Sequence, residues 1–276
     1  MPTACSRRDL TIAAKNAFDQ VRKGIAIARQ SMPGPVHFNV PTDVAAAEQP
    51  ESKRFAPVGV RTLPRRDDRG PIEALLKKAR RPLALVGVGV QIDGAERELK
   101  RFLEAWRIPF ICTYKAKGVV PEDHPLCAGA TGLSPVVDKL HMAQVREADL
   151  ILTIGFDPVE LRADWIAPWD EKKPSVNIDL VPNLHHVFRS SYEYAGSILG
   201  CLHALTAPAP KRPPSKWLDV DVDRYRRTVQ HAIESTPPKG LGPYQVAQAL
   251  REEFPRDTIA TIDTGSHRIQ IGRAHV

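Results

Sequence analysis

The segment TIATIDTGSHRI, residues 258–269, joins a β-branched run to a turn that contains Gly265, Ser266 and His267. The run 258–262 predicts a buried strand. A turn of this kind normally opens a helix, whose first backbone N–H groups have no partner within the helix and favour an anion. Gly265, Ser266 and His267 are therefore candidate ligands of a phosphate-like group.

A second glycine-containing turn is VGVGVQIDGAE, residues 86–96, between an apolar run over 82–90 and an amphipathic stretch over 93–106. Glycines in a strand-to-helix turn can let a phosphate approach the backbone. The spacing is not the dinucleotide fingerprint, which argues against an NAD oxidoreductase. We interpret Gly87 and Gly89 as residues that permit close packing, and a nucleotide site of another kind remains open.

Two further groups of polar residues could suggest a metal ion, and we interpret neither as one. His185 and His186 are adjacent, so their side chains point apart and are expected at the surface. Asp219, Asp221 and Asp223 alternate, but the glycine and the terminal acid of a calcium loop are missing. These aspartates instead suit a helix N-terminus, and no metal-binding residue is predicted.

Composition excludes several classes of protein. The chain has 276 residues and a formal charge of +7, but its basic residues are scattered without an aromatic-rich stripe, so nucleic acid is not an expected partner. No apolar run approaches the roughly 20 residues of a membrane span, and the first ten residues have no signal-peptide core. Reduced thiols of a cytoplasmic protein are expected for the four widely spaced cysteines, Cys5, Cys112, Cys127 and Cys201.

The elements that must position these residues alternate between strand and helix. The N-terminal part predicts one helix over 9–30 and a strand over 36–40, and a polar, Pro-rich linker follows. The central part predicts a doubly wound, mostly parallel α/β sheet, because its apolar strands alternate with amphipathic helices. Its inner strands are expected at 83–88, 108–112, 149–154 and 175–179, and later helices at 217–233, an outlying one, and 242–254.

Several segments resemble thiamine-diphosphate-dependent enzymes in the order of that family. PGPVHFNVPTDV, residues 33–44, resembles the end of the family's pyrimidine-binding domain. Residues 80–132 resemble its central domain, with Gly-x-Gly, an Ile-Pro strand, Lys-Gly, Pro-Glu-Asp-His-Pro and Gly-x-x-Gly in order. TIATIDTGSHRI resembles the first strand and turn of its diphosphate-binding domain, which implies that Gly265, Ser266 and His267 lie near the cofactor's diphosphate.

The segment ADLILTIGFDPVELRADW, residues 148–165, resembles the catabolic acetolactate synthases, with Ile-Gly-x-x-Pro-Val-Glu followed by a tryptophan. The Arg-Phe-Asp-Asp-Arg stretch of the flavin-containing branch is missing, which argues against FAD. The resemblance implies thiamine diphosphate and Mg²⁺, decarboxylation and carboligation of pyruvate, a small 2-oxo acid substrate, a homodimer or homotetramer, and a cytoplasmic location. Alternatives are another 2-oxo acid decarboxylase or carboligase of the family, or a non-catalytic nucleotide-binding module.

The resemblance also sets the expected domains. The family's catalytic glutamate and its Gly-Asp-Gly…Asn metal motif are not found, so no catalytic residue is assigned and the chain alone is expected to be inactive. IGRAHV with a stop matches the translation of a common sequencing adapter, so we expect a fragment truncated at both ends. The expected divisions are the end of the pyrimidine-binding domain at 1–45, a linker at 46–70, the central domain at 71–206, a linker with the outlying helix at 207–240, the start of the diphosphate-binding domain at 241–270 and an adapter-derived tail at 271–276.

Overall fold

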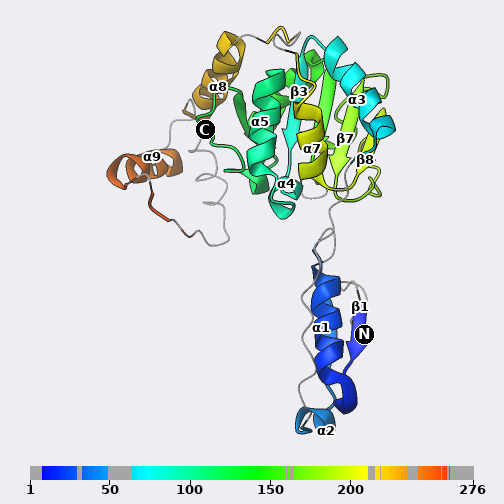
Figure 1. Ribbon diagram of the computed structural model, residues 1–276. Helices are drawn as coiled ribbons and strands as arrows, with labels where there is room; N and C mark the ends of the chain where they lie inside the picture. The colour runs from blue at the N-terminus through cyan, green and yellow to red at the C-terminus, as the bar shows by residue number, and fades with distance from the viewer. Residues whose placement is uncertain are drawn as a thin grey trace. The chain divides into compact units, whose positions relative to one another are not determined.

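The computed structural model has two compact units, one within residues 1–60 and one within residues 61–276 (Figure 1). The residues it describes are 8–29, 33–48, 64–158, 161, 165–210, 215–217, 219–234, 242–255, 257–259 and 261.

The first unit is a βαβ arrangement followed by one short helix. β1 pairs in parallel with β2, with Leu10 opposite Phe38. Gly24 lets the intervening helix lie on β2, because a Cβ at this position would come 2.1 Å from Phe38 Cζ. The elements are β1 (Arg8–Thr11), η1 (Ala14–Asn16), α1 (Ala17–Ala28), β2 (Val36–Asn39) and α2 (Thr42–Ala45).

The prediction of one helix over 9–30 is wrong for its first part. Residues 8–11 form β1, and the side chain of Gln20 fixes the turn that follows: its Oε1 accepts from Ala13 N at 2.7 Å and its Nε2 donates to Thr11 O at 3.0 Å. Pairing with β2 gives the backbone N–H and C=O groups of this segment hydrogen-bond partners. The spacing of apolar residues alone does not reveal that pairing.

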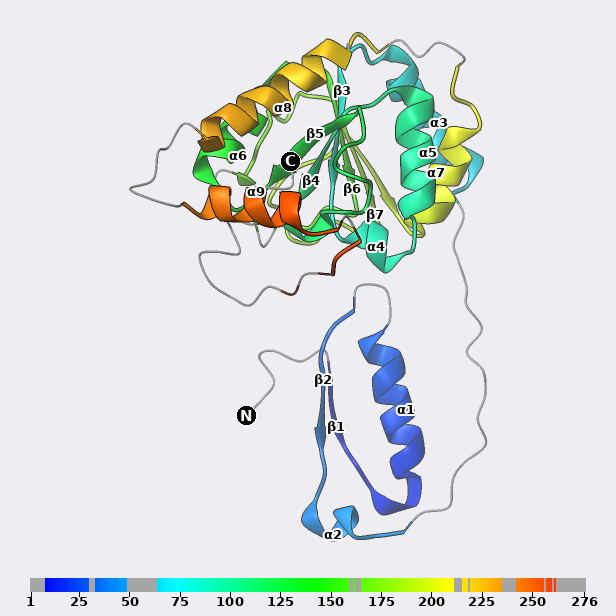
Figure 2. The same ribbon diagram turned by 90° about the vertical axis from the view of Figure 1, so that its left-hand side faces the viewer.

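The second unit contains a six-stranded sheet in the order β5-β4-β3-β6-β7-β8, and every neighbouring pair is parallel. Helices cover both faces: α3, α5 and α7 on one, α6 and α8 on the other (Figure 2). This confirms the doubly wound α/β fold. The elements are α3 (Arg66–Lys78), β3 (Pro82–Val86), α4 (Gly89–Ile92), α5 (Glu96–Trp106), β4 (Phe110–Thr113), η2 (Tyr114–Ala116), β5 (Cys127–Thr131), α6 (Pro135–Glu147), β6 (Leu150–Ile154), β7 (Ser175–Asp179), β8 (Tyr192–Ala195), α7 (Ile198–Thr206), α8 (Asp219–Glu234) and α9 (Pro243–Glu253).

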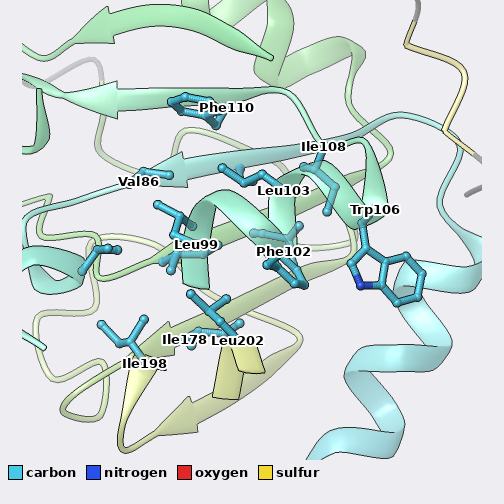
Figure 3. Packing of buried hydrophobic residues seen from close by; sticks show 14 of the residues in the cluster. Val86, Leu99, Phe102, Leu103, Trp106, Ile108, Phe110, Ile178, Ile198 and Leu202 are labelled. Carbon is cyan, nitrogen blue, oxygen red and sulfur yellow. The ribbon is translucent and has the colours of Figure 1, made fainter. Parts of the chain in front are cut away.

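The larger core lies between the sheet and α5. The amphipathic pattern predicted this face, and Leu99, Phe102, Leu103 and Trp106 are all buried there (Figure 3). Trp106 Nε1 donates to Leu205 O at 2.9 Å, which ties α5 to α7. Burying an aromatic side chain while its N–H keeps a partner avoids the cost of an unsatisfied polar group.

The opposite face is covered by α6 and α8, so the helix expected at 217–233 is present but is not outlying. α8 contacts β5 and α6, and Val222 belongs to the core on this side. Ahead of the helix, Trp217 Nε1 donates to Pro82 O at 2.7 Å, with the Arg81 guanidinium 5.1 Å from its ring centroid. Trp217 thus fixes the start of α8 against β3.

Burial along β6 agrees with the sequence. All five of its residues are buried, and Thr153, its one polar residue, donates to Asn177 Oδ1 at 2.8 Å across to β7.

The strand expected at 258–262 is not found among the described residues of this range, because Thr258 and Ile259 are in no strand and Ile259 is 91% exposed. Ile262 lies outside the described residues.

Candidate functional site

The topology places the principal crevice at the carboxyl ends of β3 and β6. These neighbouring strands belong to the two halves of the sheet, and ligands of doubly wound proteins bind where the strand order reverses. A pocket of about 210 Å³, open solvent included, lies there. Because that volume includes open solvent, the enclosed space is well below the roughly 300–1,000 Å³ typical of small-molecule sites. Its lining residues are Val88, Thr113, Tyr114, Lys115, Asp157 and Leu161.

The glycine turn beside this crevice is a packing device, as the sequence suggested. A Cβ on Gly87 would come 2.1 Å from the carbonyl oxygen of Gly155, and one on Gly89 would come 2.6 Å from Gly155 Cα. The amides are also in use: Gly87 N donates to Ile154 O at 2.9 Å and Gly89 N donates to Gly155 O at 3.0 Å. These two N–H groups are therefore directed at protein carbonyls rather than at a phosphate.

Two carboxylates stand where β6 and β7 end. Burial, opposed by the hydrogen bond from Leu180 N and reinforced by the nearby Asp157, raises the pKa of Asp179 to about 6. A perturbed acid at a crevice is a functional-site candidate on physical grounds. Sequence analysis did not single out Asp157 or Asp179. The available signal was an acid at the carboxyl end of each of two apolar strands.

His185 lies near Asp157 and packs against an aromatic ring. Its ring packs 5.2 Å from that of Phe188, and its Nδ1 accepts from Val187 N at 3.1 Å. Burial lowers the pKa of His185, against the opposing effect of Asp157. His186 is exposed. Within the described part of the chain, no three His, Cys, Asp or Glu residues group as metal ligands.

The alternating aspartates occupy the first turns of α8. Asp221 pairs with Arg224 at 3.2 Å, and Asp223 pairs with Arg226 at 3.6 Å. Both are ion pairs between neighbouring turns of one helix. Asp219 is the first residue of α8. The interpretation as a helix N-terminus is confirmed.

The cysteines within the described ranges are free thiols. Cys112, Cys127 and Cys201 are all buried, and burial raises the pKa of each, to about 11 for Cys127 and about 12 for Cys201. Such thiols are poor nucleophiles because little thiolate is present at neutral pH. Cys5 lies outside the described residues.

The predicted diphosphate ligands Gly265, Ser266 and His267 lie outside the described residues, as does the tail at 271–276. Of the acetolactate synthase-like segment, Trp165 is buried with its ring 6.1 Å from that of Phe156.

A search of the described helices finds none with the length and apolar character of a membrane span.

Comparison with known proteins finds similarity in a family model, in protein sequences and in solved structures. The family model described as thiamine pyrophosphate enzyme, central domain, matches residues 72–205. The chain is 26% identical to human 2-hydroxyacyl-CoA lyase 1 over 214 residues, which are 72% of this chain and 34% of the lyase. It is 24% identical to the acetolactate synthase isozyme 2 large subunit of Escherichia coli K12 over 275 residues, 96% of this chain and 48% of that subunit.

Among solved structures, benzoylformate decarboxylase from Polynucleobacter necessarius has a similar fold, with a TM-score of 0.73 and 19% identity over 99% of this chain and 50% of the decarboxylase. The chain thus spans about a third to a half of the length of these proteins. Its central sheet, its ordered motifs and the family model agree: residues 72–205 match the central domain of the thiamine pyrophosphate enzyme family.

Proposed function

We propose that this chain is part of an acetolactate synthase-like enzyme, which decarboxylates pyruvate and transfers the two-carbon unit to a second pyruvate. The observation that carries the proposal is the segment at 148–165, with Pro158 four residues after Ile154 at the end of β6 and a tryptophan soon after. Similarity to the E. coli acetolactate synthase subunit over 96% of the chain supports it.

The cofactors proposed for the whole enzyme are thiamine diphosphate and Mg²⁺, without FAD. Thiamine diphosphate supplies the carbanion stabilisation that decarboxylation of a 2-oxo acid needs. Gly265, Ser266 and His267 are proposed to lie at its diphosphate end, a proposal that rests on sequence because these residues are outside the described part. A cytoplasmic homodimer or homotetramer is proposed for the whole enzyme.

The 276-residue polypeptide by itself is proposed to be inactive. Its sequence offers one glycine-serine-histidine turn for a dianionic group and no metal motif of the family. A helix N-terminus contributes about 1 kcal/mol per charge, whereas micromolar affinity needs roughly 8 kcal/mol. Weak binding is therefore expected.

Two alternatives remain as proposals. The first is another 2-oxo acid decarboxylase or carboligase of the same family. The second is a nucleotide-binding module, favoured by the position of Asp157 at the crevice where such domains bind ligands. The size of the pocket and the occupied amides of Gly87 and Gly89 weigh against it.

The deciding experiment compares the 276-residue chain with the product of the source gene cloned together with its flanking DNA. We expect the longer product to bind thiamine diphosphate with Mg²⁺ in calorimetry and to form acetolactate from pyruvate, and the 276-residue chain to do neither. Turnover of a different 2-oxo acid alone would replace the proposed substrate. Thermal protection of both proteins by ADP, without any effect of thiamine diphosphate, would favour the nucleotide-binding module.

A further inference from the structure

Helix α6 carries three polar side chains into the interior of the domain. Asp138, His141 and Gln144 follow one another at intervals of three residues, and their exposed fractions are 0%, 0% and 2%. Spacing of three keeps them on neighbouring positions of one side of the helix. Burying polar groups is costly unless each finds a hydrogen-bond partner.

Only part of this polar set is satisfied by protein. Asp138 Oδ1 accepts from Thr131 Oγ1 at 2.6 Å and from Gly132 N at 2.8 Å. His141 Nε2 lies 3.3 Å from the carbonyl oxygen of Ala128. Over the described residues, no protein partner exists for the remaining buried atoms, which are Asp138 Oδ2, His141 Nδ1, Gln144 Oε1 and Gln144 Nε2.

The chemistry of these atoms specifies what can satisfy them. A carbonyl next to His141 Nε2 assigns the ring proton to that nitrogen, so Nδ1 is an acceptor. Burial lowers the pKa of His141 to about 4, which keeps the ring neutral at pH 7. Asp138 Oδ2 is also an acceptor. Two acceptors cannot bond to each other, so a donor of two hydrogens is needed between them.

We propose that the interior beside α6 is a binding site for ordered water, in which one molecule donates to both Asp138 Oδ2 and His141 Nδ1 and a second binds the Gln144 amide. Side chains three residues apart on a helix have Cβ atoms about 5–6 Å apart, a span that suits one bridging water. Buried waters typically make about three hydrogen bonds to groups that protein leaves unsatisfied. Among the residues that the structure describes, no third His, Cys, Asp or Glu joins Asp138 and His141 to complete a metal site.

The site is connected to the candidate crevice through the other oxygen of Asp138. That oxygen holds the amide of Gly132, and a Cβ on Gly132 would come 2.3 Å from Leu161 Cδ2 and 3.3 Å from Tyr114 Cδ1. Both of those residues line the pocket. Water bound at Asp138 therefore helps to fix the turn that supports one wall of the crevice.

Magnetic relaxation dispersion of water ²H and ¹⁷O, which counts long-lived internal waters, tests the proposal on the 276-residue chain. We expect His141→Leu to hold at least one such water fewer than the wild type, and His231→Leu, an exposed helix position, to be unchanged. An equal count in the wild type and the folded His141→Leu variant would overturn the proposal.

A second measurement uses the wild type alone, so it does not depend on the folding of the variant. Long-range ¹H–¹⁵N spectra should show His141 with its proton on Nε2, and water should give a nuclear Overhauser effect to the ring. A proton on Nδ1, absence of the water signal, or a metal ion in a crystal structure at this position would each contradict the water site.

Discussion

Gly89 N donates to the carbonyl oxygen of Gly155 at 3.0 Å, which joins the turn after β3 to the end of β6. This close approach also requires a glycine at position 155, because a Cβ on Gly155 would come 2.5 Å from Val90 N. Its φ of +57° lies in the left-handed region that favours glycine. Two backbone segments thus meet through Gly87, Gly89 and Gly155, without side chains between them, at the point where the strand order reverses.

Replacing Gly89 with alanine should destabilise the central domain by at least about 2 kcal/mol, because the added carbon collides with backbone that cannot move aside. The control is Gly70→Ala in α3, where no atom apart from the chain neighbours lies within 4 Å of an added Cβ. That change should alter stability by less than about 1 kcal/mol, because the gain in helix propensity is opposed by the restriction on a residue that precedes Pro71. Urea unfolding of both variants measures the difference, and equal effects would show that the contact at Gly155 is soft.

Lys173 caps the C-terminus of α6. Its Nζ donates to the carbonyl oxygens of Val145, Arg146 and Ala148 at 2.9, 2.8 and 2.6 Å. Lys173→Met keeps the aliphatic stem but loses these bonds, so we expect a loss of about 1–2 kcal/mol. The exposed neighbour Lys172→Met is the matched control and should change stability by less than about 0.5 kcal/mol. Similar unfolding midpoints for the two variants would show that Lys173 does not stabilise the C-terminus of α6.

His141 should make the fold sensitive to acid. Its pKa falls from 6.5 to about 4 because of burial, so the contribution to stability is fully present above pH 6.5 and is lost as the pH falls toward 4. The full effect is about 3 kcal/mol. Relative to His141→Leu, the wild type should lose stability over this window. Parallel curves of unfolding free energy against pH for the two proteins would contradict the assignment.

Asp179 should act in the opposite direction. Its pKa rises from 3.8 to about 6, so its protonated form is favoured in the fold and stability is lost as the pH rises through this range. Asp179→Asn should therefore be more stable than the wild type above pH 6, by up to about 3 kcal/mol. Because His141 and Asp179 offset each other between pH 4 and 6, the wild-type curve alone will be shallow. A destabilised Asp179→Asn at pH 7 would show that the charged carboxylate is the favoured form.

The central sheet could be predicted because most of its inner strands are apolar runs. Leu150 to Ile154 can be placed inside from composition alone, whereas β5 is equally long but has the sequence CAGAT, whose small side chains give no strong signal. β8 was not among the predicted inner strands, since the residues of Tyr192–Ala195 alternate in polarity at an edge of the sheet. Edge strands carry weaker signals than inner ones because only part of their surface is buried.

Fewer features of the candidate site than of the central sheet could be predicted from the sequence. The spacing of Gly87 and Gly89 does not match the dinucleotide-binding fingerprint, so the sequence predicted a packing role for them. The structure confirms that role. The raised pKa of Asp179 was not predicted, since it depends first on burial of the carboxyl group in the folded domain and then on Asp157, which follows a different strand. The packing of α8 against the sheet was also not predicted, because the hydrogen bond from Trp217 to Pro82 joins residues that are 135 positions apart in the sequence.

The all-parallel sheet has a consequence for how the chain is made. β3 ends at Val86, and its central partner β6 begins only at Leu150, so 63 residues lie between them. At a synthesis rate of about 5–20 residues per second, β3 waits roughly 3–13 s on the ribosome before β6 is complete. During that time the run Pro82–Val86, buried on both faces in the finished domain, has only β4 as a possible neighbour among the inner strands. Nascent chains that stall between these strands are thus the ones expected to recruit chaperones.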